Sequence, residues 1–252
     1  MFDRQNYIKD DSPIKKTLLK LFKKSDELIL FDVGACEGEE SIRYKKIFPE
    51  SSVFLFEPLP SNLQLITENI EKYKLENLTL IPVALSDEDG YTEFYTSSGQ
   101  PDEIQTDLDW DFGNKSSSLL APQIENLPKW LVFKEIIHVQ TMTLDFFLNK
   151  NKILNVDFLH MDVQGAELKV LYGAKEKIKN IKAIWLEVSN VELYKNQPFS
   201  NEIELFMKKN NFHLIKSEFS GEFGDQFYLN KRYFNIFSFF KGRLKLYFKI
   251  NN

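Results

Sequence analysis

Short apolar runs recur along the chain and are separated by longer segments of mixed polarity. They cover residues 28–33, 53–57, 78–83, 156–161 and 181–187. Runs that are apolar at consecutive positions and rich in Val, Ile, Leu and Phe predict strands buried on both faces of a parallel sheet. Two later runs, at 212–217 and 226–229, are separated by a glycine-containing turn and predict a closing hairpin. The pattern therefore predicts seven strands, of which five are parallel.

Between the predicted strands, apolar residues fall at helical spacing. Residues 61–73 carry Leu63, Ile66 and Ile70 on one stripe, and Ser61 is the expected N-cap. The same spacing predicts helices at 14–23 and 166–179.

One domain accounts for these elements. A chain of 252 residues is long enough for one large α/β domain and short for two domains with a linker. Because the strands alternate with helices, we expect a doubly wound α/β sheet over residues 28–230, behind a helical extension at 1–27. Residues 97–135 follow no clean period and hold a cluster of acids. Loops of this length inside compact domains are usually functional, so we expect a lid over the substrate site.

Composition and charge exclude several classes of protein. The net charge of −5 disfavours general nucleic-acid binding, which needs Lys and Arg to displace counterions from phosphates. Cys36 is the single cysteine, which excludes an internal disulfide framework and a cysteine-based zinc site. We therefore expect a reducing compartment, the cytoplasm. The polar first 24 residues hold no apolar stretch typical of a signal peptide.

The C-terminal residues 231–252 form a basic and aromatic segment. They carry six Lys or Arg residues and no acid, and aromatic and aliphatic side chains are interleaved with the basic ones in 233–250. Such a segment can lie on an anionic membrane surface, which would suit an enzyme acting on lipid-linked glycans. It can equally pack on the domain or on a second subunit of a homo-oligomer, and the sequence leaves both alternatives open.

The first predicted strand leads into a turn that points to a nucleotide cofactor. The strand end, the turn and the start of the next helix hold Asp32, Gly34, Ala35, Gly38 and Ser41. Glycines let the backbone turn sharply and approach a ligand, and a helix N-terminus directs N–H groups toward it. The dinucleotide fingerprint G-x-G-x-x-G would need glycine in place of Cys36. The pattern D-x-G-x-x-x-G instead fits the loop with which Rossmann-like methyltransferases hold the amino-acid half of S-adenosylmethionine.

The ends of the next two strands carry matching chemistry. Glu57, followed by Pro58, ends the second strand, where an acid can accept hydrogen bonds from both hydroxyls of a ribose. The third strand is followed by Ala84, Leu85 and Ser86, where small residues would let an adenine lie against the backbone. These strand ends meet at one edge of a parallel sheet, so we expect them to form one cofactor site.

These motifs resemble those of a known family. In chain order they are Asp32-Val-Gly-Ala, Phe56-Glu-Pro, Val83-Ala-Leu-Ser, Thr143-Leu-Asp and Asp157-Phe-Leu-His-Met-Asp-Val-Gln-Gly-Ala-Glu. From about residue 28 to about residue 228 the chain resembles the FkbM-type methyltransferases. The resemblance implies a class I, Rossmann-like methyltransferase fold with seven strands, S-adenosylmethionine as cofactor, and methyl transfer to a hydroxyl oxygen, often of a sugar or polyketide. His160 stands where the family usually has lysine, and Gln164 where it commonly has a second acid.

The fourth and fifth strands supply the candidate catalytic residues. Asp162, followed by Val163, lies at the carboxyl end of the fourth strand, where open α/β sheets bind ligands. Alternation places His160 on the same side as Asp162, so the two could pair, and Glu187 could join them from the fifth strand. Sugar hydroxyls have a high pKa, so a base within reach would contribute about 10²–10⁴ in rate. We assign this role to Asp162 or to the His160–Asp162 pair, with Glu187 in reserve.

Asp162 could instead orient the ammonium group of the cofactor, with Val163 beside it, and the sequence does not decide between the two roles. The spacing of the carboxylates does not suggest a metal site, so we predict no metal.

The prediction is thus an O-methyltransferase that acts on a sugar hydroxyl in polysaccharide or glycan biosynthesis. A nucleic-acid methyltransferase is disfavoured by the acidic body of the chain and by the lack of an N/D-P-P-Y/F motif. Two alternatives remain, a methyltransferase of another small molecule and an inactive, cofactor-binding partner subunit. Calorimetry with the cofactor, followed by a methyl-transfer assay, separates an enzyme from a module that only binds.

Overall fold

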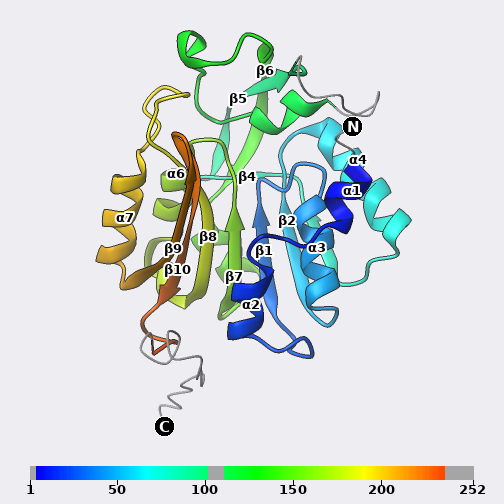
Figure 1. Cartoon of the computed structure of the whole chain (residues 1–252), viewed down its shortest axis with the longest axis vertical. Coiled ribbons are helices and arrows are strands. Elements are labelled where there is room, and N and C mark those ends of the chain that lie inside the picture. The colour runs from blue at the N-terminus through cyan, green and yellow to red at the C-terminus, as the bar shows by residue number, and fades with distance from the viewer. Residues whose placement is uncertain (1–3, 102–110, 236–252) are drawn as a thin grey trace.

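The computed structural model describes residues 4–101 and 111–235, which are built around a seven-stranded sheet (Figure 1). From edge to edge the strands are β3 (Leu78–Ile81), β2 (Ser52–Phe56), β1 (Ile29–Val33), β7 (Val156–Met161), β8 (Ile181–Ser189), β10 (Phe223–Asn230) and β9 (Phe212–Ser220). Neighbours are parallel from β3 to β8, and β10 runs antiparallel to both β8 and β9. The predicted sheet, with five parallel strands and a closing hairpin, is confirmed.

Helices cover both faces of this sheet. Successive residues of a strand point to opposite faces, and in the central strands both sets are apolar, so both faces must be buried. In β1, Leu30 packs in one core while Phe31 and Val33 pack in the other. The core around Leu30 includes residues of α2 (Lys15–Leu21), α3 (Glu39–Ile47) and α4 (Pro60–Tyr73). The opposite core includes residues of α5 (Leu144–Lys150), α6 (Glu167–Gly173) and α7 (Ser200–Lys209). The fold is therefore doubly wound, as predicted.

Two helix boundaries differ from the prediction. Leu59 is the N-cap of α4 and Pro60 its first residue, so Ser61 lies inside the first turn and the prediction of Ser61 as N-cap is wrong. Proline is favoured at the first helical position because its fixed φ suits the helix and its missing N–H would have no partner there. The helix expected at 166–179 is divided. α6 ends at Gly173, and Lys175, the first residue of a 3₁₀ helix at Lys175–Asn180, adopts a φ of +45°.

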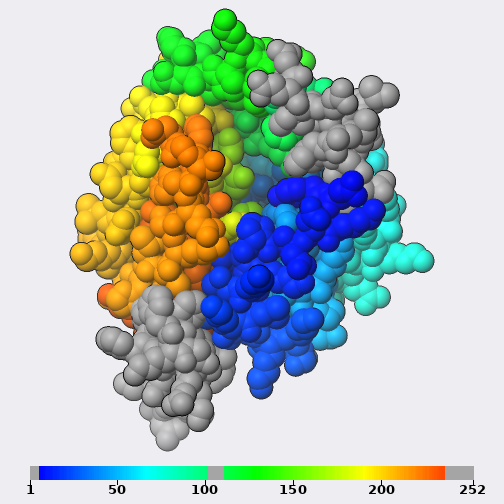
Figure 2. All heavy atoms as spheres, in the orientation of Figure 1, coloured from blue at the N-terminus to red at the C-terminus, as the bar shows by residue number. Residues whose placement is uncertain are grey.

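The N-terminal segment forms two helices that lie against the domain. α2 corresponds to the helix expected at 14–23, whereas α1 (Arg4–Lys9) was not predicted. The segment after α1 is tied to α3, because the guanidinium of Arg43 donates hydrogen bonds to the carbonyls of Asp10 and Asp11. In Figure 2 this segment, in blue, and the β9–β10 hairpin, in orange, cover neighbouring parts of the same face.

The start of the C-terminal tail is also packed. Phe234 is buried and meets the ring of Phe22 edge to face at 6.3 Å, so the chain leaves β10 against α2. Residues 236–252, and with them most of the basic and aromatic segment for which membrane contact was one alternative, lie outside the described residues. In the part of the chain that the structure describes, every helix is too short or too polar to cross a membrane.

The crossover from β3 to β7 contains a second, smaller sheet that the sequence analysis did not predict. Its strands are β4 (Ala84–Leu85), β6 (Val132–Met142) and β5 (Gly90–Ser98), in that spatial order. Figure 1 shows it above the carboxyl ends of the main strands. The predicted insertion at 97–135 begins in β5 and ends in β6, and its described part includes the 3₁₀ helices η1 (Phe112–Ser116) and η2 (Ile124–Asn126).

Candidate active site

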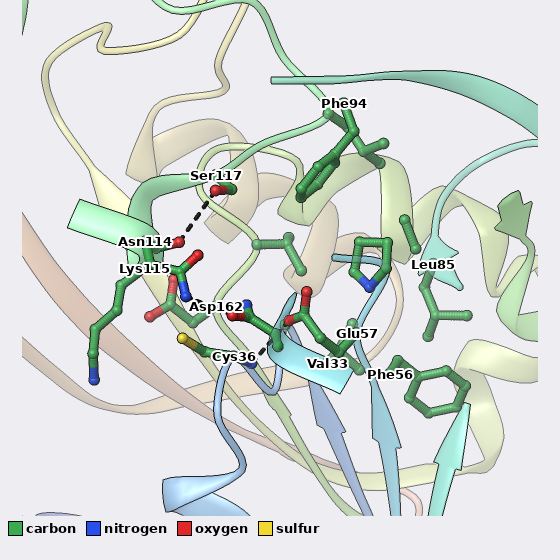
Figure 3. A pocket seen from close by; sticks show the side chains of 16 residues that line it. Val33, Cys36, Phe56, Glu57, Leu85, Phe94, Asn114, Lys115, Ser117 and Asp162 are labelled. Carbon is green, nitrogen blue, oxygen red and sulfur yellow. Dashed lines mark hydrogen bonds between the residues drawn. The ribbon is translucent and has the colours of Figure 1, made fainter. Parts of the chain in front are cut away.

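A cavity of about 500 Å³, open solvent included, lies at the carboxyl ends of β1, β2 and β7 (Figure 3). Its walls include seven residues predicted for the cofactor site: Gly34, Glu57, Pro58, Ala84, Leu85, Asp162 and Val163. In Figure 3, Glu57 and Phe56 rise from the strand ends while Phe94 approaches from the smaller sheet. The cavity thus combines apolar walls with one buried acid, a suitable environment for a nucleoside.

The turn after β1 brings two strand ends into contact. Gly34 has a φ of +80°, and a Cβ added there would lie 1.9 Å from the carbonyl oxygen of Asp162. A side chain at this position would therefore collide with backbone, which no rotamer change can relieve. Gly38, with a φ of +81°, is the N-cap of α3 and lies beside Leu55 and Ile66. Glycine is thus required at position 34 for both its conformation and the close approach of β7.

Glu57 is held rigidly at the end of β2. Its two carboxylate oxygens accept hydrogen bonds from the backbone amides of Cys36 and Leu59, each at 2.9 Å. The side chain is buried, and burial raises its pKa to about 7, against the opposing effect of these amide donors. Each carboxylate oxygen has a second lone pair. The group can therefore receive further hydroxyl donors without giving up either amide.

A second cavity, of about 490 Å³ with open solvent included, adjoins the first around Gly34, Cys36, Lys115 and Asp162. Its walls are mostly polar and charged. Besides the shared residues they are Tyr7, Asp32, Ala35, Glu39, Glu40 and His160. Because they share these four residues, we treat the two cavities as one site with an apolar half and a charged half.

The predicted pairing of His160 with Asp162 is wrong. The Nδ1 atom of His160 lies 3.2 Å from Oδ1 of Asp32, whose Oδ2 accepts a hydrogen bond from the Ser41 hydroxyl at 2.6 Å. Asp32 and His160 are opposite one another in the parallel register of β1 and β7. Adjacent strands are about 4.8 Å apart, whereas residues two apart along a strand are separated by about 6.6 Å, so the cross-strand partner is the nearer one.

The ring of His160 is also fixed from both sides. It stacks on Trp185 with ring centroids 4.7 Å apart and meets Tyr44 edge to face at 5.8 Å. Burial alone would lower the pKa of His160, but the hydrogen bond and charge of Asp32 raise it above its usual value. His160 and Ser41 therefore support Asp32, and this cluster borders the charged half of the site.

Ser86, predicted for the cofactor site, belongs to a separate polar cavity. It lines that cavity together with residues 87–92, and its hydroxyl donates a hydrogen bond to Asp87 at 2.9 Å. Two other predicted residues support the site from outside its walls, Gly38 at the start of α3 and Ser41 beneath Asp32.

The predicted catalytic acids Asp162 and Glu187 do come together. One amide nitrogen, Nε2 of Gln164, donates to Oδ1 of Asp162 at 2.7 Å and to Oε2 of Glu187 at 2.9 Å. The Tyr194 hydroxyl lies 3.0 Å from the other amide atom, Oε1 of Gln164. A single glutamine therefore sets the relative position of both acids.

A third acid, Glu167, completes this cluster. Oxygens of Asp162, Glu167 and Glu187 lie within 4.8 Å of one another, so the described residues contain a grouping that could hold a metal ion. Only Asp162 and Glu187 were predicted to lie together; Glu167 was not assigned to the site. Glu167 also accepts hydrogen bonds from the backbone amides of Val163 and Gly165, at 3.1 and 3.3 Å.

Burial and nearby acids raise the pKa of two members of this cluster, Glu167 and Glu187. Burial, followed by the charges of Asp162 and Glu167, raises the pKa of Glu187 well above its usual value. Burial raises the pKa of Glu167 to about 7 and that of the neighbouring Asp225 to about 6. At neutral pH the cluster consequently retains protons that separate carboxyl groups would have lost.

Two segments contribute residues that the sequence analysis did not assign to the site. From the crossover, Asn114 donates a hydrogen bond to Oδ1 of Asn62, beside Glu57, and Lys115 lines both cavities. From the N-terminal segment, Tyr7 lines the charged cavity and donates a hydrogen bond to Glu40 at 2.9 Å. In the sequence, only their position within the predicted lid pointed to Asn114 and Lys115, and nothing pointed to Tyr7 in α1.

The chain is similar to known methyltransferases. The family model described as the methyltransferase FkbM domain matches residues 32–214. The chain is similar to 2-O-methyltransferase NoeI of Sinorhizobium fredii, with 32% identity over 184 residues that cover 73% of this chain and 72% of NoeI. Methyltransferase 1 of Beauveria bassiana is 24% identical over 155 residues, 60% of each chain.

Among solved structures, the magnesium protoporphyrin IX methyltransferase ChlM from Synechocystis PCC 6803 with bound SAM is 8% identical and has a TM-score of 0.47. The similarity covers 90% of this chain and 79% of that chain.

Proposed function

Since this chain belongs to the FkbM methyltransferase family and transfers methyl groups from S-adenosylmethionine, we propose that its acceptor is a hydroxyl oxygen of a sugar in polysaccharide or glycan biosynthesis. The name of the relative NoeI, a 2-O-methyltransferase, supports an oxygen acceptor. The observation that carries the proposal is the cluster of acids immediately beside the cofactor cavity.

The donors and acceptors of the two cavities fit S-adenosylmethionine. Glu57 offers a fixed carboxylate to the ribose hydroxyls, beside the apolar surface of Phe56, Ala84 and Leu85 for the adenine. The charged half, with Asp32 on its wall, suits the amino-acid portion. When bound, the cofactor supplies an electrophilic methyl group on a sulfonium. Orientation of the acceptor relative to that methyl group can contribute about 7–11 kcal/mol.

Asp162 is the group that we assign to receive the hydroxyl proton. Asp162 lines both cavities and lies next to Glu187. Gln164 fixes the distance between the two acids, because its amide donates a hydrogen bond to each. Because the pKa of Glu187 is raised by burial and by Asp162, Glu187 retains its proton more readily than an isolated acid. Of the two acids, Asp162 is the one that lines both cavities, so its carboxylate is the one placed to accept the hydroxyl proton. His160, bonded to Asp32, positions that carboxylate instead of acting as the base.

The described part of the 97–135 segment supports its proposed role as a lid. Asn114, Lys115 and Ser117 line the cofactor cavity, and the Ser118 hydroxyl donates to the carbonyl of Gln164 at 2.7 Å. A segment that contacts both the cofactor cavity and Gln164, which holds Asp162 and Glu187, can exclude water from the acceptor. The cytoplasmic location, the membrane contact of 233–250 and a homo-oligomeric state remain predictions.

The proposal is tested by labelled methyl transfer to a panel of nucleotide sugars and glycans. The label should enter a sugar and should be located by NMR as an O-methyl group on a ring hydroxyl. Labelling of a different class of small molecule alone would refute the sugar proposal. Cofactor binding without transfer to any acceptor would favour a partner subunit that has lost catalysis.

A further inference from the structure

The charged cavity has an excess of acids over bases on its described walls. Four carboxylates line it, from Asp32, Glu39, Glu40 and Asp162. The basic side chains are His160, whose Nδ1 lies against Asp32, and Lys115. The excess of acids suits a ligand that carries more positive than negative charge, and Lys115 could hold one anionic group of that ligand.

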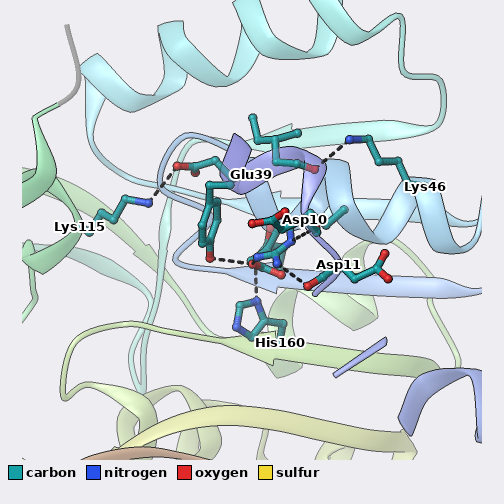
Figure 4. Close-up of polar contacts among 11 residues, drawn as sticks. Asp10, Asp11, Glu39, Lys46, Lys115 and His160 are labelled. Carbon is teal, nitrogen blue, oxygen red and sulfur yellow. Dashed lines mark hydrogen bonds and ion pairs between the residues drawn. The ribbon is translucent and has the colours of Figure 1, made fainter. Parts of the chain in front are cut away.

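Lys115 reaches this cavity from the crossover. Figure 4 shows it approaching α3 from the opposite side of the site, where its Nζ lies 3.0 Å from Oε1 of the buried Glu39. The same ammonium lies 5.0 Å from the ring centroid of Tyr7 in α1. Burial alone would lower the pKa of Lys115, but the charge of Glu39 raises it, so the side chain is cationic at neutral pH.

The amino-acid half of S-adenosylmethionine has the charges that match these walls. Its sulfonium and ammonium groups are positive, and its α-carboxylate is negative. The acids on the walls suit the two cations, and the carboxylate needs a cationic donor. An ammonium group has three N–H donors, so one lysine can contact Glu39 and a second carboxylate at the same time.

We infer that Lys115 binds the α-carboxylate of the cofactor and thereby fastens the crossover over the amino-acid half of the site. The adjacent residue Asn114 contacts Asn62, next to Glu57 in the apolar half. The short helix η1 therefore contacts both halves of the site through consecutive residues. The inference concerns the cofactor only and does not depend on which acceptor is methylated.

Two ligands separate carboxylate binding from general damage to the site. S-adenosylhomocysteine carries the α-carboxylate, whereas 5′-methylthioadenosine shares the adenosine and the sulfur but lacks the amino-acid group. Calorimetry with both ligands should show that Lys115→Met lowers the affinity for S-adenosylhomocysteine by roughly 10- to 100-fold, as expected for the loss of a charged hydrogen bond. The affinity for 5′-methylthioadenosine should fall by far less.

Lys182→Met is the matched control. Lys182 forms a comparable ion pair with Asp157 at 2.6 Å, at the amino end of β8 and away from both cavities. It should leave both affinities unchanged, and thermal melts of both variants establish that they are folded. Lys115→Arg, which keeps the charge, should retain most of the affinity for S-adenosylhomocysteine.

Equal losses for the two ligands, or no loss for S-adenosylhomocysteine, would overturn the inference. The inference would also be overturned if His160→Gln, and not Lys115→Met, lowered the affinity for S-adenosylhomocysteine without lowering that for 5′-methylthioadenosine. A failure to methylate any sugar would refute the proposed acceptor but would leave this comparison of ligands unaffected.

Discussion

Gly34→Ala is expected to damage both the stability of the protein and its affinity for the cofactor. The added methyl group has two separable effects. It places a side chain in a left-handed conformation, at a φ of +80°, and it places a Cβ 1.9 Å from the carbonyl oxygen of Asp162. Since that oxygen belongs to the backbone at the end of β7, the ends of β1 and β7 must move apart to relieve the contact.

The size of each effect follows from these values. The left-handed conformation costs an L-residue about 1–2 kcal/mol. Forced overpacking against surroundings that yield only partly costs about a further 1–3 kcal/mol. Gly221→Ala isolates the first effect, because Gly221 has a similar φ of +68° and an added Cβ would meet nothing within 4 Å. Gly34→Ala should therefore be more destabilising than Gly221→Ala by about 1–3 kcal/mol.

Urea unfolding of the wild type and both variants measures this difference, and calorimetry with S-adenosylhomocysteine measures affinity. Gly34 lines both cavities, so its variant should also bind the ligand more weakly, whereas Gly221→Ala should bind as the wild type does. Equal stabilities for the two variants, with equal affinities, would refute the argument that the approach of β7 requires glycine here.

Three further predictions concern the acids. Burial raises the pKa of Glu57 to about 7 in the folded state from an ordinary 4.5, so its contribution to stability is present below about pH 4.5 and is lost as the pH rises through 7. Glu57→Gln should therefore reduce the decline in unfolding free energy between about pH 5 and about pH 7.5 in urea titrations, and an unchanged slope would contradict the shift. Asp162→Asn should lower the rate of methyl transfer by about 10²–10⁴ if Asp162 is the base. If rate and cofactor affinity both survive this change, the assignment is wrong. Because no metal is predicted, EDTA should leave methyl transfer unchanged in a radiolabel assay. A loss that Mg²⁺ restores would instead assign Asp162, Glu167 and Glu187 as a metal site.

Much of the cofactor site could be predicted because each of its motifs is a short stretch of sequence at the end of a predicted strand. Gly34 and Ala84 each follow a recognisable apolar run, and Glu57 ends one. Parallel strands bring their carboxyl ends to one edge, so position in the chain alone is enough to place these residues together. The same logic placed Asp162 and Glu187 near one another, as Gln164 confirms by contacting both.

The partner of His160 could not be predicted in this way. Alternation along a strand shows which face a side chain occupies, but the register between strands decides what it meets across the sheet. Here the register of β1 and β7 sets Asp32 opposite His160. An apolar run contains no information on register, so the choice between Asp32 and Asp162 required the structure.

The smaller sheet and the residues that it brings to the site were missed for a different reason. β5 and β6 are largely exposed and rich in polar residues, so they lack the apolar runs that mark the main strands. Lys115 and Tyr7 approach the site through long-range packing of the crossover and of α1. Neither segment carries a local pattern that indicates a ligand.

The structure of the protein with S-adenosylhomocysteine is the most direct test of where the cofactor lies. We predict that both ribose hydroxyls lie within hydrogen-bond distance of the Glu57 carboxylate, with the amino-acid portion in the cavity lined by Asp32 and Lys115. A ligand bound elsewhere, with the turn at Gly34 covered by protein side chains, would contradict the account.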